Sequence, residues 1–363
     1  MAEPKVRFGI VGCGAIHGTH AGAIRNIDGA ELVGFYDIVP ERATAAAEKF
    51  EATAADSLEA LCEKVDAICV CVPSGDHANV GIRAARAGKH IVCEKPIDVT
   101  LPAAKSLIEA CEKAGVTMTV ISQHRFAHDI RQVREAVQGG ALGPILAGDM
   151  FNKWFRTQAY YDSGDWRGTW KLDGGGCLMN QGVHYVDMLQ WIMGGVKAVR
   201  AQARTSAHER IEVEDIANAL LEFENGAVGV IQASTAYYPG LAERLEIHGK
   251  WGTAIIEADR LKLWEVDEKA ASEGLYGKGV LSQPAPNVQT QGGQGNETGA
   301  ADPSAIWAEQ HRLQLEDFTQ AVREKRPPFI GGRDALEPLK VILAVYESAR
   351  RNGERVALSD LDS

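Results

Sequence analysis

Residues 6–18 read VRFGIVGCGAIHG, in which a short apolar strand runs into a glycine-rich turn and then into a helical segment. Gly12 permits a tight turn, and Gly14 leaves room for a ligand phosphate to approach the backbone at the start of the helix. His17 stands where the third glycine of the pattern G-x-G-x-x-G would be, so a glycine-rich turn without a ligand is the plain alternative. The stretch predicts the first strand–turn–helix unit of a nucleotide-binding sheet.

Apolar runs and amphipathic helical runs alternate through the first 123 residues. The run ICVCV at 68–72 is apolar on both faces, as a strand covered by helices on both sides must be. This alternation predicts an α/β fold with a doubly wound parallel sheet. The expected strands are 6–12, 31–37, 66–73, 90–95 and 116–122, and the expected helices are 15–26, 40–50, 76–87 and 101–114.

The pattern changes after about residue 125, where longer strand candidates follow one another. Turn signals such as Asn225-Gly226 separate some of them, and one-face alternation predicts an open, mainly antiparallel sheet. We therefore predict two domains, a cofactor domain at 1–123 and an α+β domain at 124–363 for substrate binding and oligomerisation, with the final helix able to pack back on the first domain. The expected strands are 197–207, 216–224, 227–236, 244–249, 253–257 and 261–266, the expected helices are 304–325 and 333–352, and 286–303 is expected to be a long polar loop that serves as a lid or an oligomer arm.

Composition narrows the class of protein. Hydrophobic residues make up 45% of the 363 residues, and the net charge of −11 argues against a nucleic-acid partner or an anionic membrane. No segment approaches the roughly 18 apolar residues of a membrane-spanning helix, and the N-terminal residues lack the features of a signal peptide. The seven cysteines include no CxxC pair, and buried thiols in a reducing cytosol explain them best. We expect a cytoplasmic protein.

The expected strands 31–37 and 66–73 carry further signals for a dinucleotide. Asp37 ends the second strand, where a carboxylate can accept hydrogen bonds from both hydroxyls of an adenosine ribose. Ile38 follows it instead of an arginine, which favours NAD over NADP. Beyond the expected strand 66–73, Ser74 and His77 are expected to contact the cofactor, since ligands bind at the carboxyl ends of such strands. The alternative is that Ser74 or Asp76 caps the next helix.

A lysine stands at the end of the expected strand 90–95, in the sequence Cys93-Glu94-Lys95-Pro96. A lysine at the end of a buried strand is costly unless it is paired or functional. Its ammonium group can bind a substrate hydroxyl or the nicotinamide ribose. The alternative is a surface Glu–Lys pair.

The run GGGCLMNQGVHYVD at 174–187 combines three glycines, which allow a turn, with a helix-like segment. Asn180 and His184 are four residues apart and are expected on one helix face. An amide beside an imidazole suits a site that binds a hydroxyl and moves one proton. A capped or buried structural histidine is the alternative for His184.

Residues 154–170 are rich in tryptophan, tyrosine and arginine. Aromatic faces cover sugar rings, and arginine binds carboxylate or phosphate through two parallel hydrogen bonds. Arg156 and Arg167 are therefore expected to bind substrate, although an aromatic core or interface would have the same composition. His124 and His128 have a spacing suited to zinc, but no third ligand is indicated, and we expect no metal.

The order of these motifs resembles that of the Gfo/Idh/MocA oxidoreductases. The GxG turn, Asp37, PSGxH, EKP, GGGxLxxxGxHxxD and the segment HRLQLEDFTQAVREKRPPFIGG at 311–332 together cover essentially the whole chain. The resemblance implies a Rossmann domain, a second domain whose open sheet commonly forms a homodimer or homotetramer interface, and NAD(P)-linked oxidation or reduction of sugars and polyols. It places the functional lysine at Lys95 and the functional histidine at His184.

Many members of that family carry an aspartate where this chain has Asn180. The pair Asn180 and His184 instead resembles the subgroup acting on the C3 hydroxyl of UDP-N-acetyl-hexosaminuronic acids, which implies a sugar or nucleotide-sugar substrate. An NAD-dependent glycosidase that oxidises C3 transiently and a non-catalytic cofactor-sensing regulator stay as alternatives. The candidate residues are Lys95 and His184 for catalysis, Asn180, Arg156, Trp166, Arg167 and Tyr160 for substrate, and Gly12, Gly14, Ala15, Ile16, Asp37, Pro73, Ser74, His77, Glu94, Lys95 and Gln123 for cofactor.

Overall fold

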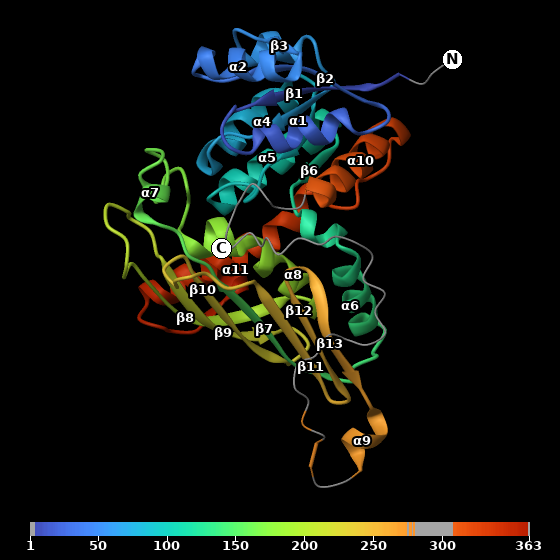
Figure 1. The fold of residues 1–363 in the computed structure, drawn as a ribbon, viewed down its shortest axis with the longest axis vertical. Helices are drawn as coiled ribbons and strands as arrows, with labels where there is room; N and C mark the ends of the chain where they lie inside the picture. The colour runs from blue at the N-terminus through green and yellow to red at the C-terminus, as the bar shows by residue number, and fades with distance from the viewer. Residues whose placement is uncertain (1–3, 274–275, 278, 280–307, 362–363) are drawn as a thin grey trace. The chain divides into compact units, whose positions relative to one another are not determined.

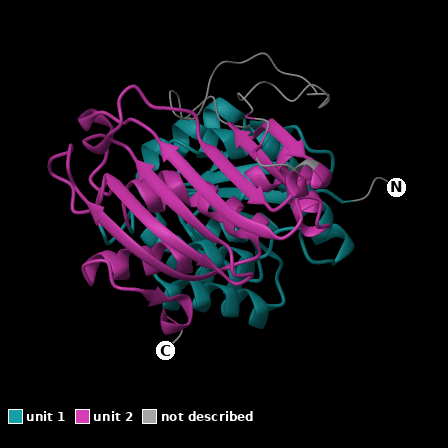
Figure 2. Ribbon diagram, turned by 90° about the horizontal axis from the view of Figure 1, so that it is seen from below, with its two compact units in different colours: residues 1–123, 170–174, 307–339 teal, residues 124–169, 175–306, 340–363 magenta. Residues whose placement is uncertain are grey.

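The computed structural model describes residues 4–273, 276–277, 279 and 308–361. The chain forms two compact units, which Figure 2 colours separately. Unit 1 comprises residues 1–123, 170–174 and 307–339, and unit 2 comprises residues 124–169, 175–306 and 340–363. The predicted loop 286–303 lies outside the described residues.

Unit 1 contains a six-stranded sheet in which every pair of neighbours is parallel (Figure 1). The strand order β3-β2-β1-β4-β5-β6 reverses direction at β1, as in a doubly wound nucleotide-binding sheet. The α/β fold predicted for this part of the chain is thus confirmed. The strands are β1 (Val6–Val11), β2 (Ala30–Tyr36), β3 (Thr53–Ala54), β4 (Ala67–Val70), β5 (His90–Cys93) and β6 (Met118–Val120).

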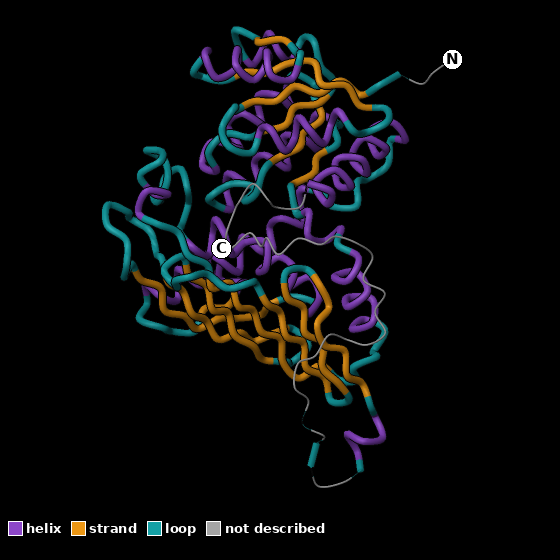
Figure 3. The backbone as a smooth tube through the Cα atoms, in the orientation of Figure 1, coloured by secondary structure: helices purple, strands orange, loops and turns teal. Residues whose placement is uncertain are grey.

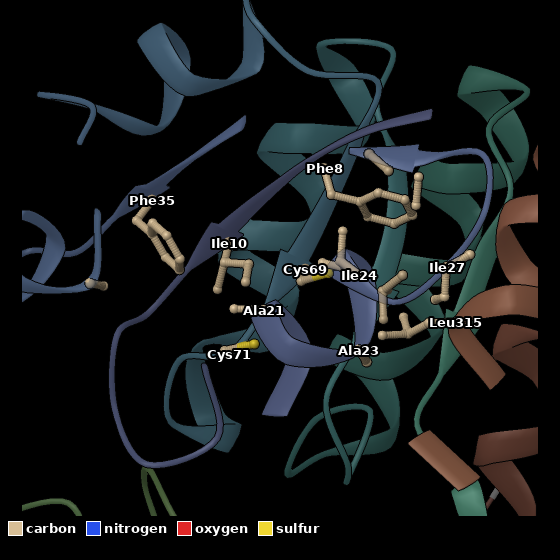
Figure 4. Close-up of a cluster of buried hydrophobic side chains, with 14 of the residues drawn as sticks. Phe8, Ile10, Ala21, Ala23, Ile24, Ile27, Phe35, Cys69, Cys71 and Leu315 are labelled. Atoms are coloured by element: carbon tan, nitrogen blue, oxygen red, sulfur yellow. The ribbon is translucent and has the colours of Figure 1, made fainter. Parts of the chain in front are cut away.

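The helices of unit 1 pack apolar side chains against this sheet. Figure 4 shows one cluster, in which Phe8 and Ile10 of β1 meet Ile24 of α1 and Leu315 of α10. The apolar face of α10 therefore belongs to the core of unit 1, although it lies about 200 residues beyond β6 along the chain. The helices are α1 (His17–Arg25), α2 (Pro40–Phe50), α3 (Leu58–Cys62), α4 (His77–Arg86), α5 (Leu101–Ala114) and α10 (Ala308–Glu324), with short 3₁₀ turns η1 (Ser74–Asp76) and η5 (Gly332–Ala335). The 3₁₀ turn η2 (Gln123–Phe126) begins at the last residue of the first segment of unit 1 and continues into unit 2.

Unit 2 contains an eight-stranded sheet in the order β13-β12-β11-β7-β10-β9-β8-β14. Figure 3 shows the strands of both sheets in orange. All of its neighbouring pairs are antiparallel except β10 with β7, so the predicted mainly antiparallel sheet is confirmed. The strands β7 and β14 were not among the predicted elements. The strands are β7 (Ile145–Lys153), β8 (Val196–Arg204), β9 (Ile216–Phe223), β10 (Val228–Ser234), β11 (Arg244–Gly249), β12 (Gly252–Glu257), β13 (Arg260–Val266) and β14 (Val356–Ala357).

Helix α8 (Val183–Met193) packs against β7 and against α6 (His128–Gln138), and α6 also contacts β12 and β13. A π-helical turn, η3 (Cys177–Gly182), leads directly into α8. π-Helical turns are rare and occur often at functional sites. The remaining helical segments are α7 (Gln158–Tyr161), α9 (Glu268–Ser272), α11 (Leu336–Arg350) and η6 (Leu358–Leu361).

All seven cysteines are buried, and none of them forms a disulfide. Within the described part of the chain, no helix has the length and apolar character needed to cross a lipid bilayer.

Candidate active site

The first glycine of the turn after β1 is required by its conformation and its surroundings. Gly12 has a φ of +95°, and a Cβ there would lie 2.5 Å from the carbonyl oxygen of Cys71. Gly14 and Ala15 are exposed, Ile16 is half-buried, and a Cβ on Gly14 would meet no atom within 4 Å. The turn therefore leaves open space in front of its backbone at the start of α1, which fits the approach of a dinucleotide phosphate.

Asp37 lies at the end of β2, where its carboxylate is bound to the same turn. One oxygen accepts a hydrogen bond of 2.7 Å from the backbone N–H of Cys13, and the other accepts one of 2.8 Å from Val39. Burial, with Asp37 beside it, raises the pKa of the Cys13 thiol to about 12. The neighbouring Ile38 is 87% exposed, so this position offers no cation to a ribose 2′-phosphate. The arrangement suits a ribose with two hydroxyls.

The segment after β4 is held tightly by backbone contacts. The ring of His77 lies between the carbonyl oxygens of Pro96 and Val72, at 2.7 and 2.9 Å, and burial lowers the pKa of this histidine. Ser74 is buried beside Pro73. A Cβ on Gly75 would lie 2.1 Å from the carbonyl oxygen of Lys171. His77 thus fixes the loop that carries Lys95. It stays a prediction that the cofactor contacts Pro73, Ser74 and His77.

The alternative reading of this segment, a helix cap by Ser74 or Asp76, is wrong. Among the described residues, neither side chain caps η1 or α4. Asp98 supplies the cap instead, since its carboxylate accepts a 3.0 Å hydrogen bond from the N–H of Ala78. Sequence reasoning missed Asp98 because it lies 20 residues beyond the helix start that it caps.

Glu94 is buried in unit 1 between two histidines from different helices. Its Oε1 is 2.7 Å from Nε2 of His20 on α1 and 3.5 Å from Nε2 of His311 on α10. Its Oε2 accepts a 3.2 Å hydrogen bond from the backbone N–H of Lys95. Burial alone would raise the pKa of Glu94, but the hydrogen bonds from the two histidines outweigh it and hold the pKa well below its usual range. The carboxylate is therefore ionised and holds the backbone of the half-buried Lys95.

This geometry rules out two other interpretations of Glu94. The alternative of a surface Glu–Lys pair is wrong, because Glu94 is only 6% exposed and is bonded to histidines. The three side chains bring possible metal ligands within 4.8 Å of one another. However, two ligands of one tetrahedral zinc ion are ~3.3 Å apart. The 2.7 Å between His20 and Glu94 is a hydrogen-bond length, so the cluster is a charged hydrogen-bonded group.

The glycine run before η3 is shaped by a carboxylate that sequence reasoning missed. The oxygens of Glu214 accept hydrogen bonds of 2.9 Å from the N–H groups of Gly176 and Leu178 and from the hydroxyl of Tyr346. A Cβ on Gly176 would lie 1.7 Å from the carbonyl oxygen of Glu214, and one on Gly175 would lie 2.1 Å from the hydroxyl of Tyr346. Burial raises the pKa of Glu214 to about 7. Only glycine fits at these positions.

Asn180 and His184 lie in two different helical segments. Asn180 belongs to the π-helical turn η3, and His184 belongs to the first turn of α8; both are half-buried. Asp187, three residues after His184, accepts a hydrogen bond of 2.8 Å from the guanidinium group of Arg125, and both side chains are buried. The ring of Trp191 lies 5.0 Å from that guanidinium group. This buried ion pair fixes α8 against η2, where the predicted cofactor residue Gln123 is also buried.

The predicted substrate residues around Tyr160 are close together in unit 2. The guanidinium groups of Arg156 and Arg167 lie 5.6 and 4.2 Å from the ring of Tyr160, and Arg167 also lies 4.6 Å from the ring of Trp166. Arg167 donates a 2.7 Å hydrogen bond to the Tyr160 hydroxyl, and Gln181 of η3 donates another of 2.9 Å. Two cations and two aromatic rings are thereby joined to the helix that carries Asn180. The sequence did not single out Gln181.

The histidines considered for zinc do not converge on one point. Nδ1 of His124 is 2.6 Å from Asp259, whereas His128 is exposed and lies 3.2 Å from Asp129. The two rings thus have separate carboxylate partners. Within the described residues, neither ring belongs to a group of three metal-binding side chains.

Comparison with known proteins identifies the family. Residues 6–122 match the oxidoreductase family with an NAD-binding Rossmann fold, and residues 130–255 match the GFO/IDH/MocA C-terminal domain. The myo-inositol 2-dehydrogenase of Thermotoga maritima is 30% identical over 94% of this chain and 96% of that protein. The chain belongs to the Gfo/Idh/MocA family of oxidoreductases.

Two further proteins are similar to this Gfo/Idh/MocA chain over almost its whole length. The WlbA dehydrogenase of Bordetella pertussis, solved in complex with NADH and UDP-GlcNAcA, is 34% identical with a TM-score of 0.82, over 97% of this chain and 98% of that chain. The D-apiose dehydrogenase of Paraburkholderia graminis is 28% identical over 99% of this chain and 91% of that protein. The predicted enzyme class, the NAD cofactor and the resemblance to UDP-sugar-binding members are confirmed.

The buried cluster around Glu94 predicts a defined pH dependence of stability. The pKa of Glu94 is lowered, and the pKa of His20 is raised well above its usual value. Burial alone would lower the pKa of His20, but its hydrogen bonds and the nearby sulfur and carboxylate groups outweigh burial. The pair of Glu94 and His20 therefore makes its full contribution to the free energy of unfolding between pH 4.5 and pH 6.5, the ordinary pKa values of the two side chains. It is lost when the pH falls through the lowered pKa of Glu94 or rises through the raised pKa of His20. Glu94→Gln should destabilise the protein by about 3–5 kcal/mol in this window.

Calorimetric melting curves of the wild type and Glu94→Gln across pH measure this effect. The difference in Tm should be largest in the window and should shrink toward both extremes. Glu59→Gln is the matched control, because Glu59 forms an exposed pair with Arg83 and its loss should change Tm little at every pH. A difference for Glu94→Gln that is constant with pH would contradict the ionised pair.

Proposed function

We propose that this protein oxidises a secondary hydroxyl, at C3, of a nucleotide-linked sugar that carries a carboxylate, with NAD as the hydride acceptor. The observation that carries the proposal is the link between two groups in unit 2. Gln181 connects η3, which contains Asn180, to the Arg156–Tyr160–Arg167 cluster. The amide of Asn180 suits a hydroxyl, and the Arg156–Tyr160–Arg167 cluster suits a sugar ring with an anionic substituent. The complex of the WlbA dehydrogenase with UDP-GlcNAcA supports the same substrate class.

The arginine pair suits an anion for a physical reason. Arg156 is buried, and burial lowers its pKa, with Arg167 nearby acting in the same direction. Two guanidinium groups on one tyrosine ring repel each other and are incompletely hydrated, so an anionic ligand that binds between them relieves both penalties. The ring faces of Tyr160 and Trp166 provide an apolar surface for a sugar.

The proposed mechanism gives His184 and Lys95 separate roles. His184 accepts the proton of the substrate hydroxyl as general base, since an imidazole titrates close to neutral pH. The ammonium group of Lys95 donates a hydrogen bond to the same oxygen and stabilises the charge that develops there. The O–H and C–H bonds break and a C=O bond forms. NAD bound at the turn after β1 would supply the acceptor for the hydride that leaves with the C–H bond. Convergence of Lys95 and His184 on one oxygen is part of the proposal.

A screen of substrates tests the proposed specificity. NADH formation should be fastest with UDP-N-acetylglucosaminuronic acid, and at least about tenfold slower in kcat/KM with UDP-N-acetylglucosamine, its neutral counterpart, because the arginine pair loses its anion. Arg167→Ala should reduce this discrimination. Preference for a free aldose or an inositol would contradict the nucleotide-sugar assignment. Release of sugar from an aryl glycoside without net NADH would favour the glycosidase, and NAD binding without any turnover would favour the regulator.

Substitution of the two proposed catalytic residues separates chemistry from cofactor binding. His184→Asn and Lys95→Ala should each lower kcat by about 10²–10⁴-fold, the usual contribution of a positioned acid–base group. The Kd for NAD, measured by calorimetric titration, should stay close to that of the wild type in His184→Asn. A near-normal kcat in either variant would remove that residue from the mechanism.

We also propose that a second copy of the chain packs on the sheet of unit 2. Val228 on β10 and Leu220 on β9 are 59% and 60% exposed, and the half-buried Val230 pairs directly with Leu220. Large apolar side chains exposed on neighbouring strands mark protein interfaces. Sedimentation velocity should show an assembly of two or four copies, which Leu220→Lys combined with Val228→Lys should weaken. A wild-type protein that sediments as one copy would contradict this assignment.

A further inference from the structure

A second histidine lies beside the proposed catalytic one. The ring centroids of His124 and His184 are 4.8 Å apart, with an angle of 55° between the ring planes. His124 lies on η2 and is only 2% exposed, whereas His184 lies on α8 and is half-buried. Both belong to unit 2. The charge state of His124 and its partners therefore acts on His184 at short range and in surroundings poor in water.

His124 is bound to a buried carboxylate. Its Nδ1 is 2.6 Å from one oxygen of Asp259, and the hydroxyl of Tyr185 donates a 3.0 Å hydrogen bond to the other oxygen. Asp259 is 6% exposed. Tyr185 follows His184 directly in α8, so the helix that carries the proposed base also braces the carboxylate. Asp259, His124 and His184 form a continuous chain of side chains, which we call the histidine relay.

The backbone at Asp259 is in the left-handed region. Ala258 and Asp259 form the turn between β12 and β13 and have φ values of +49° and +60°. Such two-residue turns favour asparagine and glycine, because a positive φ is costly for residues with a Cβ. The N–H of Ala258 is bonded to the carbonyl oxygen of Glu243, which fixes one end of the turn. Aspartate, like asparagine, is one of the few residues with a Cβ that tolerate a positive φ, so the turn fixes where the Asp259 carboxylate lies.

Two other acidic side chains, Glu243 and Tyr185, lie close to the relay. Glu243, immediately before β11, is fully buried, and burial, with Asp259 adding to it, raises its pKa to about 7. Burial likewise raises the pKa of Tyr185 well above its usual value, so its hydroxyl is a neutral donor. The other charged groups nearby are Asp129 on α6, which accepts a hydrogen bond from Leu261, and Arg156 after β7, which faces Glu243.

We propose that His124 and Asp259 are positioning residues for His184, and that the pair orients its ring and stabilises the imidazolium that forms when His184 accepts the hydroxyl proton. The proposal rests on the role of His184 as base in the proposed function. The Asp259 carboxylate lies in the turn between β12 and β13, and it acts on His184 through the ring of His124. It supplies what the aspartate four residues before the histidine would supply in relatives that lack Asn180.

Asp259→Asn tests the relay with little change in shape. Asparagine is among the residues that best tolerate a positive φ, so the turn should persist while the charge is lost. The NMR signal of the His184 Hε1 proton, assigned by its absence in His184→Asn, should titrate with a midpoint lower by about one pH unit, because a nearby anion favours the protonated ring. The acid limb of the kcat/KM profile should move to lower pH by the same amount, and kcat should fall about tenfold or more with the KM for NAD unchanged.

Two further variants keep the test decisive. His124→Gln should give the same shift of the midpoint, and combining it with Asp259→Asn should add nothing, because both changes break one chain. His128→Gln is the matched control, since His128 also contacts a carboxylate but lies exposed on α6; it should leave the His184 midpoint and kcat unchanged. A folded Asp259→Asn or His124→Gln protein, judged by its Tm, with a wild-type midpoint would overturn the relay.

The titration needs no substrate, so the relay and the proposed function can fail separately. A wild-type protein that oxidises none of the sugars, yet shows the shift of the midpoint in Asp259→Asn, would retain the coupling and lose the proposed function. Active enzyme with an unchanged midpoint and an unchanged pH profile in Asp259→Asn would lose the relay alone.

Discussion

The position of the proposed catalytic helix depends on one buried carboxylate. The first N–H groups of a helix have no partner within the helix, and they must be satisfied from outside when they are buried. Glu214 satisfies two of them, at Gly176 and Leu178, and its own backbone carbonyl lies so close to Gly176 that no side chain fits there. The contact fixes where η3 begins, and therefore where Asn180 and His184 lie along the chain. Loss of this carboxylate would leave buried donors unpaired at the start of the segment that carries both residues.

A second buried carboxylate, Glu94, fixes the segment that carries Lys95, but its pKa is shifted in the opposite direction from that of Glu214. The partners of Glu94 include two imidazoles, which can hold a proton, and the pKa of Glu94 falls well below its usual range. The partners of Glu214 are backbone N–H groups and a tyrosine hydroxyl, which are neutral, so burial dominates and its pKa rises to about 7. Neutral donors satisfy the geometry of a buried carboxylate without fully compensating its charge. Glu214 reaches η3 from a distant part of the chain, whereas Glu94 is the direct neighbour of Lys95 and is itself held by histidines of two other helices. Such supporting contacts keep a site fixed before substrate arrives.

Local patterns in the sequence were sufficient for the cofactor turn and for five of the six strands of the parallel sheet; the two-residue strand β3 was missed. The apolar runs of β4 and β5 are short and uninterrupted, and Gly12 and Asp37 have the spacing of a nucleotide-binding fold. Strand β7 was missed because Gly148 and Asp149 interrupt its apolar pattern, although β7 lies in the middle of its sheet. The partners of the candidate site were missed for another reason. Asp259 lies 135 residues from His124, and Glu214 lies 38 residues from Gly176, so only the fold brings them together. The sequence identifies donors and acceptors, but pairing over such distances depends on tertiary packing.

The amide at position 180 and the carboxylate at position 259 are consistent parts of one electrostatic arrangement. Under the proposed function, the substrate carries a carboxylate and a diphosphate, and it must approach His184 closely. An aspartate at position 180, four residues before His184, would place another anion near that substrate, where repulsion would weaken binding. Asp259 acts on His184 through the ring of His124, and its second oxygen is bound by Tyr185 in a buried setting. The interposed imidazole keeps the favourable interaction with a protonated His184, while the greater distance reduces repulsion on the ligand. A neutral Asn180 with a remote, buried Asp259 therefore suits an acidic sugar better than an aspartate beside the histidine would.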